Sequence, residues 1–288
     1  MSTSAPHHLA TKMIDVPGGG PVSQVAALDT GPAGDLPTVL MVPGYTGSKE
    51  DFGPLLDPLA AAGRRVVAID LPGQYESPGP DDAAWYTVDN LAAVVLEVAD
   101  AMGGRIQLVG HSFGGLVSRS AVIAAPDRFL SLTLMDSGPA AIGGQRDQML
   151  VVAQQIYQQG GIEAVYQVME QLAQGDPNYL AQPVEVREFL RARFVTNVPA
   201  GLVGMGEALR SEPDRVDELR AAAPALPLLV LYGAADDAWA PATQAAMAAR
   251  LGAEQVVIAD AVHSPAIENT APTLAALRAF WDRVEAGG

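Results

Sequence analysis

Short apolar runs alternate with longer amphipathic stretches along most of the chain. The runs are nearly continuous in apolar character, which predicts strands covered on both faces of a sheet. In the stretches between them, apolar residues recur every three or four positions, as in Leu91, Val94 and Val98, which predicts helices with one buried face. This alternation is typical of βα units and a mainly parallel sheet. The predicted strands are 38–42, 65–69, 105–109, 130–135, 226–232 and 255–259.

Two further strand candidates lie near the start of the chain, at 11–16 and 22–28. The sequence PGGGP separates them, with no helical stretch between, so we expect a hairpin at one edge of the sheet. The expected sheet therefore has eight strands.

The βα rhythm stops between Ser137 and Ala225. This segment has helical periodicity throughout and is punctuated by Gly160, Gly161, Pro183 and Pro199. An all-helical segment inserted after a strand predicts a cap or lid. The expected domains are a core formed by 1–136 and 226–288 and a helical cap formed by 137–225.

Composition limits the possible functions. The chain has 288 residues, 49% of them hydrophobic, which suits one large domain with a full core. Its 33 acidic and 17 basic residues give a net charge of -16, which argues against nucleic-acid binding and favours a neutral substrate. The N-terminus lacks a signal-peptide pattern, and no run approaches the roughly 18 apolar residues of a membrane helix. We expect a cytoplasmic protein without a membrane partner, as a monomer or homodimer.

The segment VGHSFGG, residues 109–115, carries the strongest chemical signal. It matches GxSxG, follows a predicted strand and precedes a helical stretch at 116–125. In a sharp strand-to-helix turn, side chains two residues from the serine would collide, and glycine removes both collisions. The turn exposes the Ser112 hydroxyl at a helix N-terminus, where backbone N–H groups favour a developing oxyanion. Since the chain has no cysteine, Ser112 is the candidate nucleophile.

A serine nucleophile needs a base, and the chain has four histidines. His7 and His8 lie in the polar leader and are expected to be tail residues rather than ligands. His111 adjoins the serine, and the turn should aim its side chain away from the hydroxyl. His263 follows the last predicted strand, at the sheet edge that carries the serine, and is the candidate base.

A catalytic histidine also needs an acid that holds its tautomer. Asp236 and Asp237 are adjacent in the loop GAADDAWAP, just past a predicted strand, and only one of them can point at His263. We expect Asp236 to do so. Asp136, which follows the strand at 130–135, is the competing acid.

The chain resembles the α/β-hydrolase superfamily over nearly its whole length outside the leader. The resemblance rests on the elbow GHSFGG, the acid loop GAADDAWAP, the histidine loop VHSP and the loop VPGYTGS. It implies an α/β-hydrolase fold with a mostly parallel eight-stranded sheet flanked by helices and an all-helical cap. It also implies an oxyanion hole formed by the backbone N–H groups of Tyr45 and Phe113. Pro43 departs from the histidine that many members carry there, and DLPGQYES at 70–77 resembles a structural turn of the family.

The expected function is that of a cofactor-independent serine hydrolase that cleaves a carboxylic ester or a related small acyl substrate through an acyl-enzyme. No metal is expected. The substrate should be small, neutral and apolar, with Trp239, Tyr157 and Met205 as candidate contacts and Met149, Met169 and Phe194 as further apolar cap residues. Haloalkane dehalogenases and epoxide hydrolases of this fold carry aspartate at the elbow, so Ser112 argues against both. Carbon–carbon bond hydrolysis, lactone or thioester hydrolysis, haloperoxidase-like perhydrolysis and hydroxynitrile cleavage share the triad and stay open, as does a non-catalytic ligand-binding module.

Overall fold

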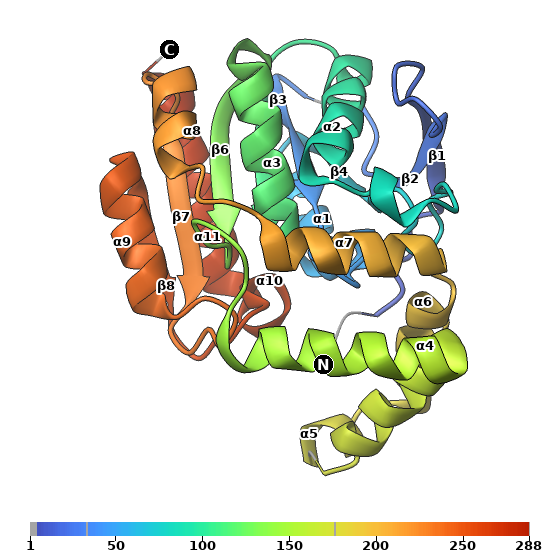
Figure 1. The fold of residues 1–288 in the computed structure, drawn as a ribbon. Helices are drawn as coiled ribbons and strands as arrows, with labels where there is room; N and C mark the ends of the chain where they lie inside the picture. The colour runs from blue at the N-terminus through green and yellow to red at the C-terminus, as the bar shows by residue number, and fades with distance from the viewer. Residues whose placement is uncertain (1–4, 33, 176, 288) are drawn as a thin grey trace.

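The computed structural model describes residues 5–32, 34–175 and 177–287. Within these residues, eight strands form one sheet with the order β1-β2-β4-β3-β5-β6-β7-β8 (Figure 1). Every strand begins and ends within two residues of its predicted bounds. The strands are β1 (Lys12–Asp15), β2 (Gln24–Asp29), β3 (Leu36–Val42), β4 (Arg64–Ile69), β5 (Ile106–His111), β6 (Phe129–Met135), β7 (Leu228–Gly233) and β8 (Glu254–Ile258).

The pairing of the strands confirms a mostly parallel sheet. Strands β3 to β8 pair with their neighbours in parallel, whereas β2 is antiparallel to β4. Strand β1 pairs antiparallel with β2 at the edge of the sheet, as the predicted hairpin requires. Because neighbouring parallel strands end at the same edge, the loops that follow β5, β7 and β8 come together there.

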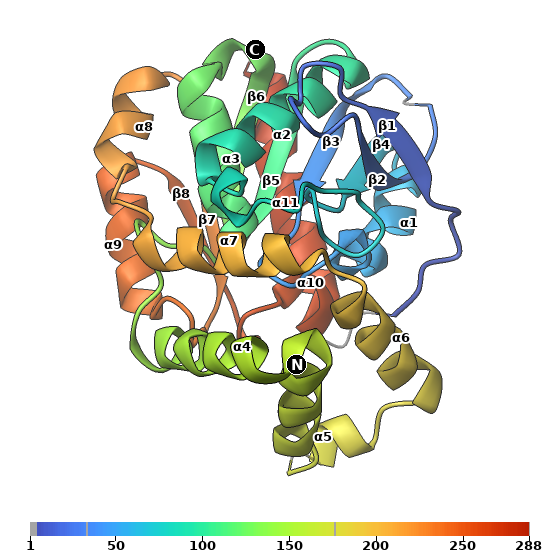
Figure 2. The ribbon, with the colours of Figure 1, turned by 45° about the vertical axis from the view of Figure 1, so that its right-hand side comes forward.

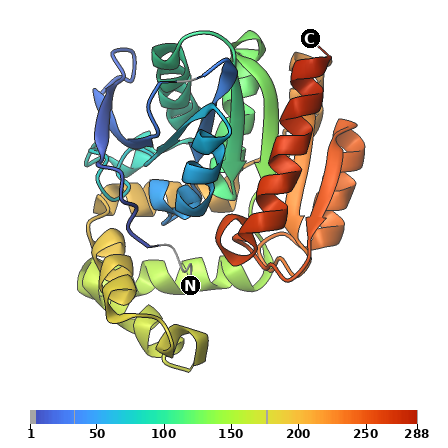
Figure 3. The same cartoon turned by 180° about the vertical axis from the view of Figure 1, so that it is seen from behind.

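Helices cover both faces of the sheet. Helices α2 (Val88–Met102), α3 (Phe113–Ala124), α8 (Val216–Ala222) and α9 (Pro241–Leu251) contribute to the larger apolar cluster. Helices α1 (Gly53–Ala61), α10 (Pro265–Glu268) and α11 (Thr270–Ala286) contribute to the cluster on the other face (Figure 3). The expected apolar stripe of α2 is buried, since Leu91, Val94 and Val98 are each 0% exposed, and Leu277 and Trp281 on α11 are equally buried. Three short 3₁₀ helices are η1 (Lys49–Phe52), η2 (Ala83–Trp85) and η3 (Pro126–Arg128).

Four of the five helices described between β6 and β7 lie across the edge of the sheet where the parallel strands end (Figures 1 and 2). They are α4 (Gly144–Ala173), α5 (Pro177–Leu180), α6 (Val184–Val195) and α7 (Pro199–Ser211). Non-helical backbone at Gly161, with φ 71° and ψ −170°, bends α4 at the glycine pair noted in the sequence. Helix α8 packs against α3 and α9 instead. We propose that α4 to α7 form the cap.

The cap buries fewer apolar side chains than its periodicity indicates. Met149 and Val152 on α4 are 54% and 51% exposed, and Leu172 is 70% exposed. Met149 is therefore neither a core residue nor part of an enclosed pocket. Met149 and Val152 therefore leave an apolar part of the α4 surface in contact with solvent. Among the described residues, no helix combines the length and apolar character that crossing a membrane would require.

Candidate active site

Ser112 stands at the turn between β5 and α3. Its backbone adopts φ 53° and ψ −119°, a conformation rare for residues other than glycine. Such a conformation costs about 1–3 kcal/mol and persists only where the surroundings enforce it. Here the Ser112 N–H donates to the Met135 carbonyl at 2.8 Å, and the Gly115 N–H donates to the Ser112 carbonyl at 2.9 Å. The turn is thus tied to β6 and to the first turn of α3.

The two flanking glycines are required by close backbone contacts. A Cβ on Gly110 would lie 2.4 Å from the Gly114 carbonyl oxygen, and a Cβ on Gly114 would lie 2.4 Å from the Pro43 carbonyl oxygen. Helix α3 begins at Phe113, whereas the sequence indicated a start at 116. The reason is that Gly114 and Gly115 belong to the helix but add no apolar signal. Phe113 therefore presents one of the N–H groups that have no partner within the helix.

The structure brings Ser112, His263 and Asp236 together from the loops that follow β5, β8 and β7. His263 Nε2 lies 2.9 Å from Ser112 Oγ, and His263 Nδ1 lies 2.9 Å from Asp236 Oδ1. Ser112 is 6% exposed, and the side chains of His263 and Asp236 are 12% and 0% exposed. The three side chains therefore form one continuous hydrogen-bonded chain that is almost closed to solvent.

Position distinguishes the two adjacent aspartates. Asp236 faces His263, whereas the Asp237 side chain is 58% exposed and pairs with Arg146 on α4. The Asp236 carboxylate also accepts the Ala238 N–H at 2.8 Å and Gln244 Nε2 at 2.6 Å. Burial acts to raise the pKa of Asp236, but its hydrogen bond and electrostatic interaction with His263 outweigh this and hold that pKa below its ordinary value.

Two residues that the sequence did not single out as functional support this chain. Gln244, on α9, is fully buried and donates to both Asp236 Oδ2 and the Trp239 carbonyl. The His111 ring makes its hydrogen bond to the backbone of the histidine loop, since its Nε2 lies 2.6 Å from the His263 carbonyl oxygen. Because a carbonyl only accepts, His111 Nε2 carries the hydrogen. No sequence pattern marks Gln244, since the contact depends on how α9 returns past the acid loop.

The loop after β3 lies beside Ser112. A Cβ on Gly44 would lie 3.0 Å from Ser112 Cβ. The turn at 70–77 supports this loop, since Gln74 Nε2 donates to the Gly44 carbonyl at 2.8 Å. Tyr45 contacts the cap, and its hydroxyl donates to the Leu202 carbonyl on α7 at 3.0 Å. Burial raises the pKa of the Tyr45 phenol, so this donor stays neutral.

The three candidate substrate contacts occupy different surroundings. The Trp239 ring lies 6.4 Å from the His263 ring, centroid to centroid, and its Nε1 donates to the Ala140 carbonyl. Met205 is 0% exposed within the larger apolar cluster. Tyr157 is half-buried and packs against a small cap cluster that Tyr45 also contacts. Of the three, Trp239 is the one with a ring contact to the triad.

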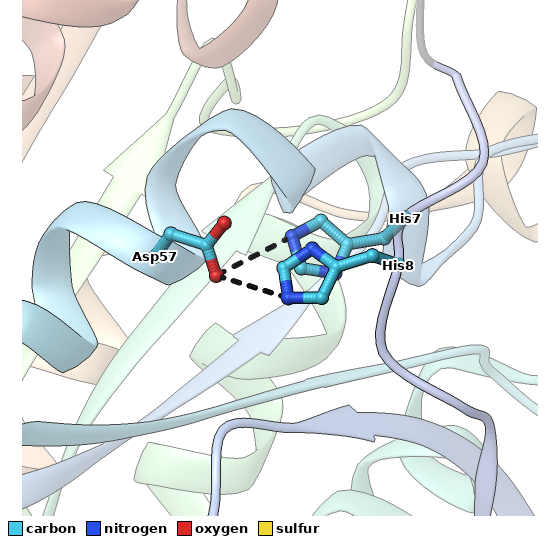
Figure 4. A group of neighbouring side chains, drawn as sticks. All are labelled: His7, His8 and Asp57. Carbon is cyan, nitrogen blue, oxygen red and sulfur yellow. Dashed lines mark ion pairs between the residues drawn. The ribbon is translucent and has the colours of Figure 1, made fainter.

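The two leader histidines form a separate group with Asp57 on α1 (Figure 4). His7 Nε2 and His8 Nε2 lie 3.9 Å and 3.6 Å from Asp57 Oδ1. His7 Nδ1 accepts the Leu9 N–H at 3.2 Å, so in the neutral ring Nε2 carries the hydrogen and has no lone pair for a metal. His7 therefore presents an N–H to the Asp57 carboxylate and is not a metal ligand in this arrangement.

Comparison with known proteins agrees with the geometry. Residues 39–276 match the model of the alpha/beta hydrolase family. The chain is 31% identical over 244 residues to the dihydrolipoyllysine-residue acetyltransferase component of the acetoin cleaving system of Pseudomonas putida, covering 83% of this chain and 62% of that protein. It is 28% identical over 173 residues to rhodomycin D methylesterase DauP of Streptomyces sp. (strain C5), covering 59% of this chain and 51% of that protein. The chain thus spans less than two thirds of the length of these curated relatives.

A solved carboxylesterase structure from Nitrososphaera gargenis superimposes with a TM-score of 0.78 at 19% identity, over 96% of this chain and 100% of that one. This likeness shows the fold. The family match confirms the resemblance and the hydrolase class predicted from the sequence. With its elbow serine, acid loop and histidine loop in one hydrogen-bonded chain on this sheet, the protein belongs to the alpha/beta hydrolase family.

Proposed function

We propose that the protein is a serine hydrolase that cleaves a carboxylic ester or a related small acyl substrate through an acyl-enzyme. The observation that carries this proposal is the hydrogen-bonded chain from Asp236 through His263 to Ser112, with 2.9 Å at both links. A hydroxyl that shares a hydrogen bond with a neutral imidazole can lose its proton as it attacks a carbonyl. These side chains supply nucleophile, base and orienting acid without a cofactor.

Each step of the proposed reaction uses one of these groups. His263 Nε2 takes the Ser112 proton as Oγ attacks the acyl carbon, and Asp236 stabilises the imidazolium that forms. The backbone N–H groups of Phe113 and Tyr45 receive the oxyanion. Phe113 follows Ser112 and Tyr45 follows Gly44, and a Cβ on Gly44 would lie only 3.0 Å from Ser112 Cβ. The imidazolium then protonates the leaving group. Water, activated by the same imidazole, releases the acid from Ser112.

The substrate is proposed to bind between this edge of the sheet and the cap. Trp239 is the nearest candidate wall, because its indole lies beside His263 and is 5% exposed. Tyr157 and Met205 would contribute from the cap side. These three side chains carry no charge, which favours an uncharged acyl group. The methylesterase activity named for the Streptomyces relative supports an ester as the acyl donor.

Labelling with a fluorophosphonate, read by intact mass, tests the proposal. We expect one adduct on the wild type and none on Ser112→Ala, while Ser264→Ala, beside the base, keeps the adduct. A panel of p-nitrophenyl esters of increasing chain length then measures the size of the acyl site. A folded wild type that takes up no adduct and cleaves no ester would contradict the proposal and favour a ligand-binding module.

A further inference from the structure

A second carboxyl group lies behind the triad acid. Asp136 follows β6, has φ 46°, and its side chain is fully buried. Its Oδ1 accepts the Gly233 N–H at 2.9 Å. One ligand atom each of Asp136, Asp236 and His263 lies within 4.8 Å of the other two, so the two carboxyl groups are close neighbours in a buried site. A fourth side chain, the buried carboxyl group of Asp136, therefore lies next to Asp236 and His263.

The hydrogen-bond donors around Asp136 and Asp236 indicate which of the two carboxyl groups carries a proton. Asp236 Oδ1 accepts from Ala238 and His263, and its Oδ2 accepts from Gln244. Asp136 Oδ2 is buried, and within the described part of the chain no N–H or O–H donor faces it. A hydrogen bond between two carboxyl groups needs a proton on one of them. Asp136 Oδ2 is the oxygen that can carry it, because every oxygen of Asp236 already accepts from a donor.

The charges around Asp136 favour the same assignment. Burial, the Asp236 charge and the more distant Glu268 on α10 raise the pKa of Asp136 well above its ordinary value, against the effect of the Gly233 N–H. Of the two histidines at the site, His263 makes its hydrogen bond to Asp236, and His111 makes its own to the His263 carbonyl. Two carboxylates this close in a buried site cannot both ionise readily, so the acid that lacks the histidine stays neutral.

We propose that Asp136 is a positioning residue for the triad: it remains protonated while Asp236 is ionised, and its carboxylic acid donates a hydrogen bond to the Asp236 carboxylate. This inference rests on the proposed function, since it assigns a role through His263 and Ser112. The donor holds the plane of the Asp236 carboxylate and spreads its charge without adding a second negative charge near His263. Asp136 itself does not contact the reacting atoms.

The substitution Asp136→Asn tests whether Asp136 is a neutral hydrogen-bond donor or a charged carboxylate. Asparagine keeps the shape, an oxygen that can accept the Gly233 N–H and an NH2 group that can donate to Asp236, but it can never ionise. If Asp136 is neutral in the wild type, the substitution leaves the charge near His263 unchanged. If Asp136 is ionised, the substitution removes a full charge within 4.8 Å, which would lower the pH midpoint of activity by about two units. The matched control is Asp237→Asn, which makes the same chemical change at the exposed neighbour of the triad acid.

The experiment measures the rate constant of Ser112 labelling by a fluorophosphonate against pH, for the wild type, Asp136→Asn, Asp136→Ala and Asp237→Asn. We expect the wild type and Asp136→Asn to share one midpoint to within about 0.3 pH units, and Asp136→Ala to label roughly tenfold more slowly because Asp236 loses a donor. A midpoint lowered by about two units in Asp136→Asn would overturn the proposal.

Infrared spectroscopy of the unlabelled protein gives a readout that does not depend on activity. At neutral pH, the difference spectrum of wild type minus Asp136→Asn should contain the carbonyl band of a buried protonated carboxylic acid, and that of wild type minus Asp237→Asn should not. The subtraction cancels any band from Asp70, a second buried carboxyl whose pKa burial raises to about 7. A difference spectrum of wild type minus Asp136→Asn that lacks this band would overturn the inference. A wild type that shows this band but takes up no fluorophosphonate would contradict the proposed function and leave the proton assignment standing.

Discussion

Acidification should destabilise the fold through His111. The ring is buried, and its Nε2–H donates to the His263 carbonyl at 2.6 Å. Burial and the neighbouring His263 lower the pKa of His111 to about 4 from 6.5. Because the folded pKa lies below the unfolded value, the unfolded chain binds more protons in this window. The stabilisation is therefore complete above pH 6.5 and is lost as the pH falls toward 4.

The size of the effect follows from these two pKa values. Linkage predicts a loss of about 2 kcal/mol between about pH 7.5 and about pH 5, approaching about 3 kcal/mol below the folded pKa. The variant His111→Gln keeps an N–H donor for the carbonyl but binds no proton. The free energy of unfolding of His111→Gln should therefore not show this decrease as the pH falls.

Urea unfolding at a series of pH values measures the difference. The stability advantage of the wild type over His111→Gln should shrink by about 2 kcal/mol from about pH 7.5 to about pH 5. His8→Gln is the matched control, because it removes a histidine whose side chain is 65% exposed. If wild type and His111→Gln lose stability in parallel across this range, the reasoning from burial is refuted.

Three further substitutions test the packing and polar contacts of the site. Gly114→Ala should destabilise the fold by about 3 kcal/mol in urea unfolding, because its Cβ would lie 2.4 Å from backbone carbonyls at the end of β3; Gly143→Ala, whose Cβ would meet nothing within 4 Å, should be close to neutral. Gln244→Met should lower kcat for p-nitrophenyl acetate about tenfold by removing the donor to Asp236 Oδ2, and an unchanged kcat would contradict that role. Asp136→Asn should gain thermal stability over the wild type as the pH rises above about 4, because a raised folded pKa costs stability once the unfolded carboxyl ionises; equal melting temperatures at neutral pH would count against it.

The sheet was predictable because buried parallel strands must be apolar on both faces. Each run of that kind in the sequence became a strand, and the run interrupted by PGGGP became the edge hairpin. The start of α3 was predicted too late, since helix periodicity is read from apolar side chains and glycines have none. The exposed apolar positions of α4 had the right period, but periodicity does not say whether a partner covers the face.

The proposed nucleophile and the proposed base could be selected from the sequence because few residues compete for those roles. The chain has no cysteine and four histidines, and one serine carries the glycine spacing of a strained turn. The acid of the proposed triad was harder to predict, since Asp236 and Asp237 are adjacent in one loop. Only the path of that loop turns Asp236 toward His263 and Asp237 toward Arg146.

The sequence alone decides the order of strands and helices, the residue types of the triad and the strain at the elbow, because these depend on local backbone geometry and on patterns a few residues long. Tertiary structure decides which charges meet. Asp136 and Asp236 are 100 positions apart, and Gln244 and His111 reach the triad from other elements. Their protonation states follow from burial and from distances of a few ångströms between loops, which no pattern along the chain records.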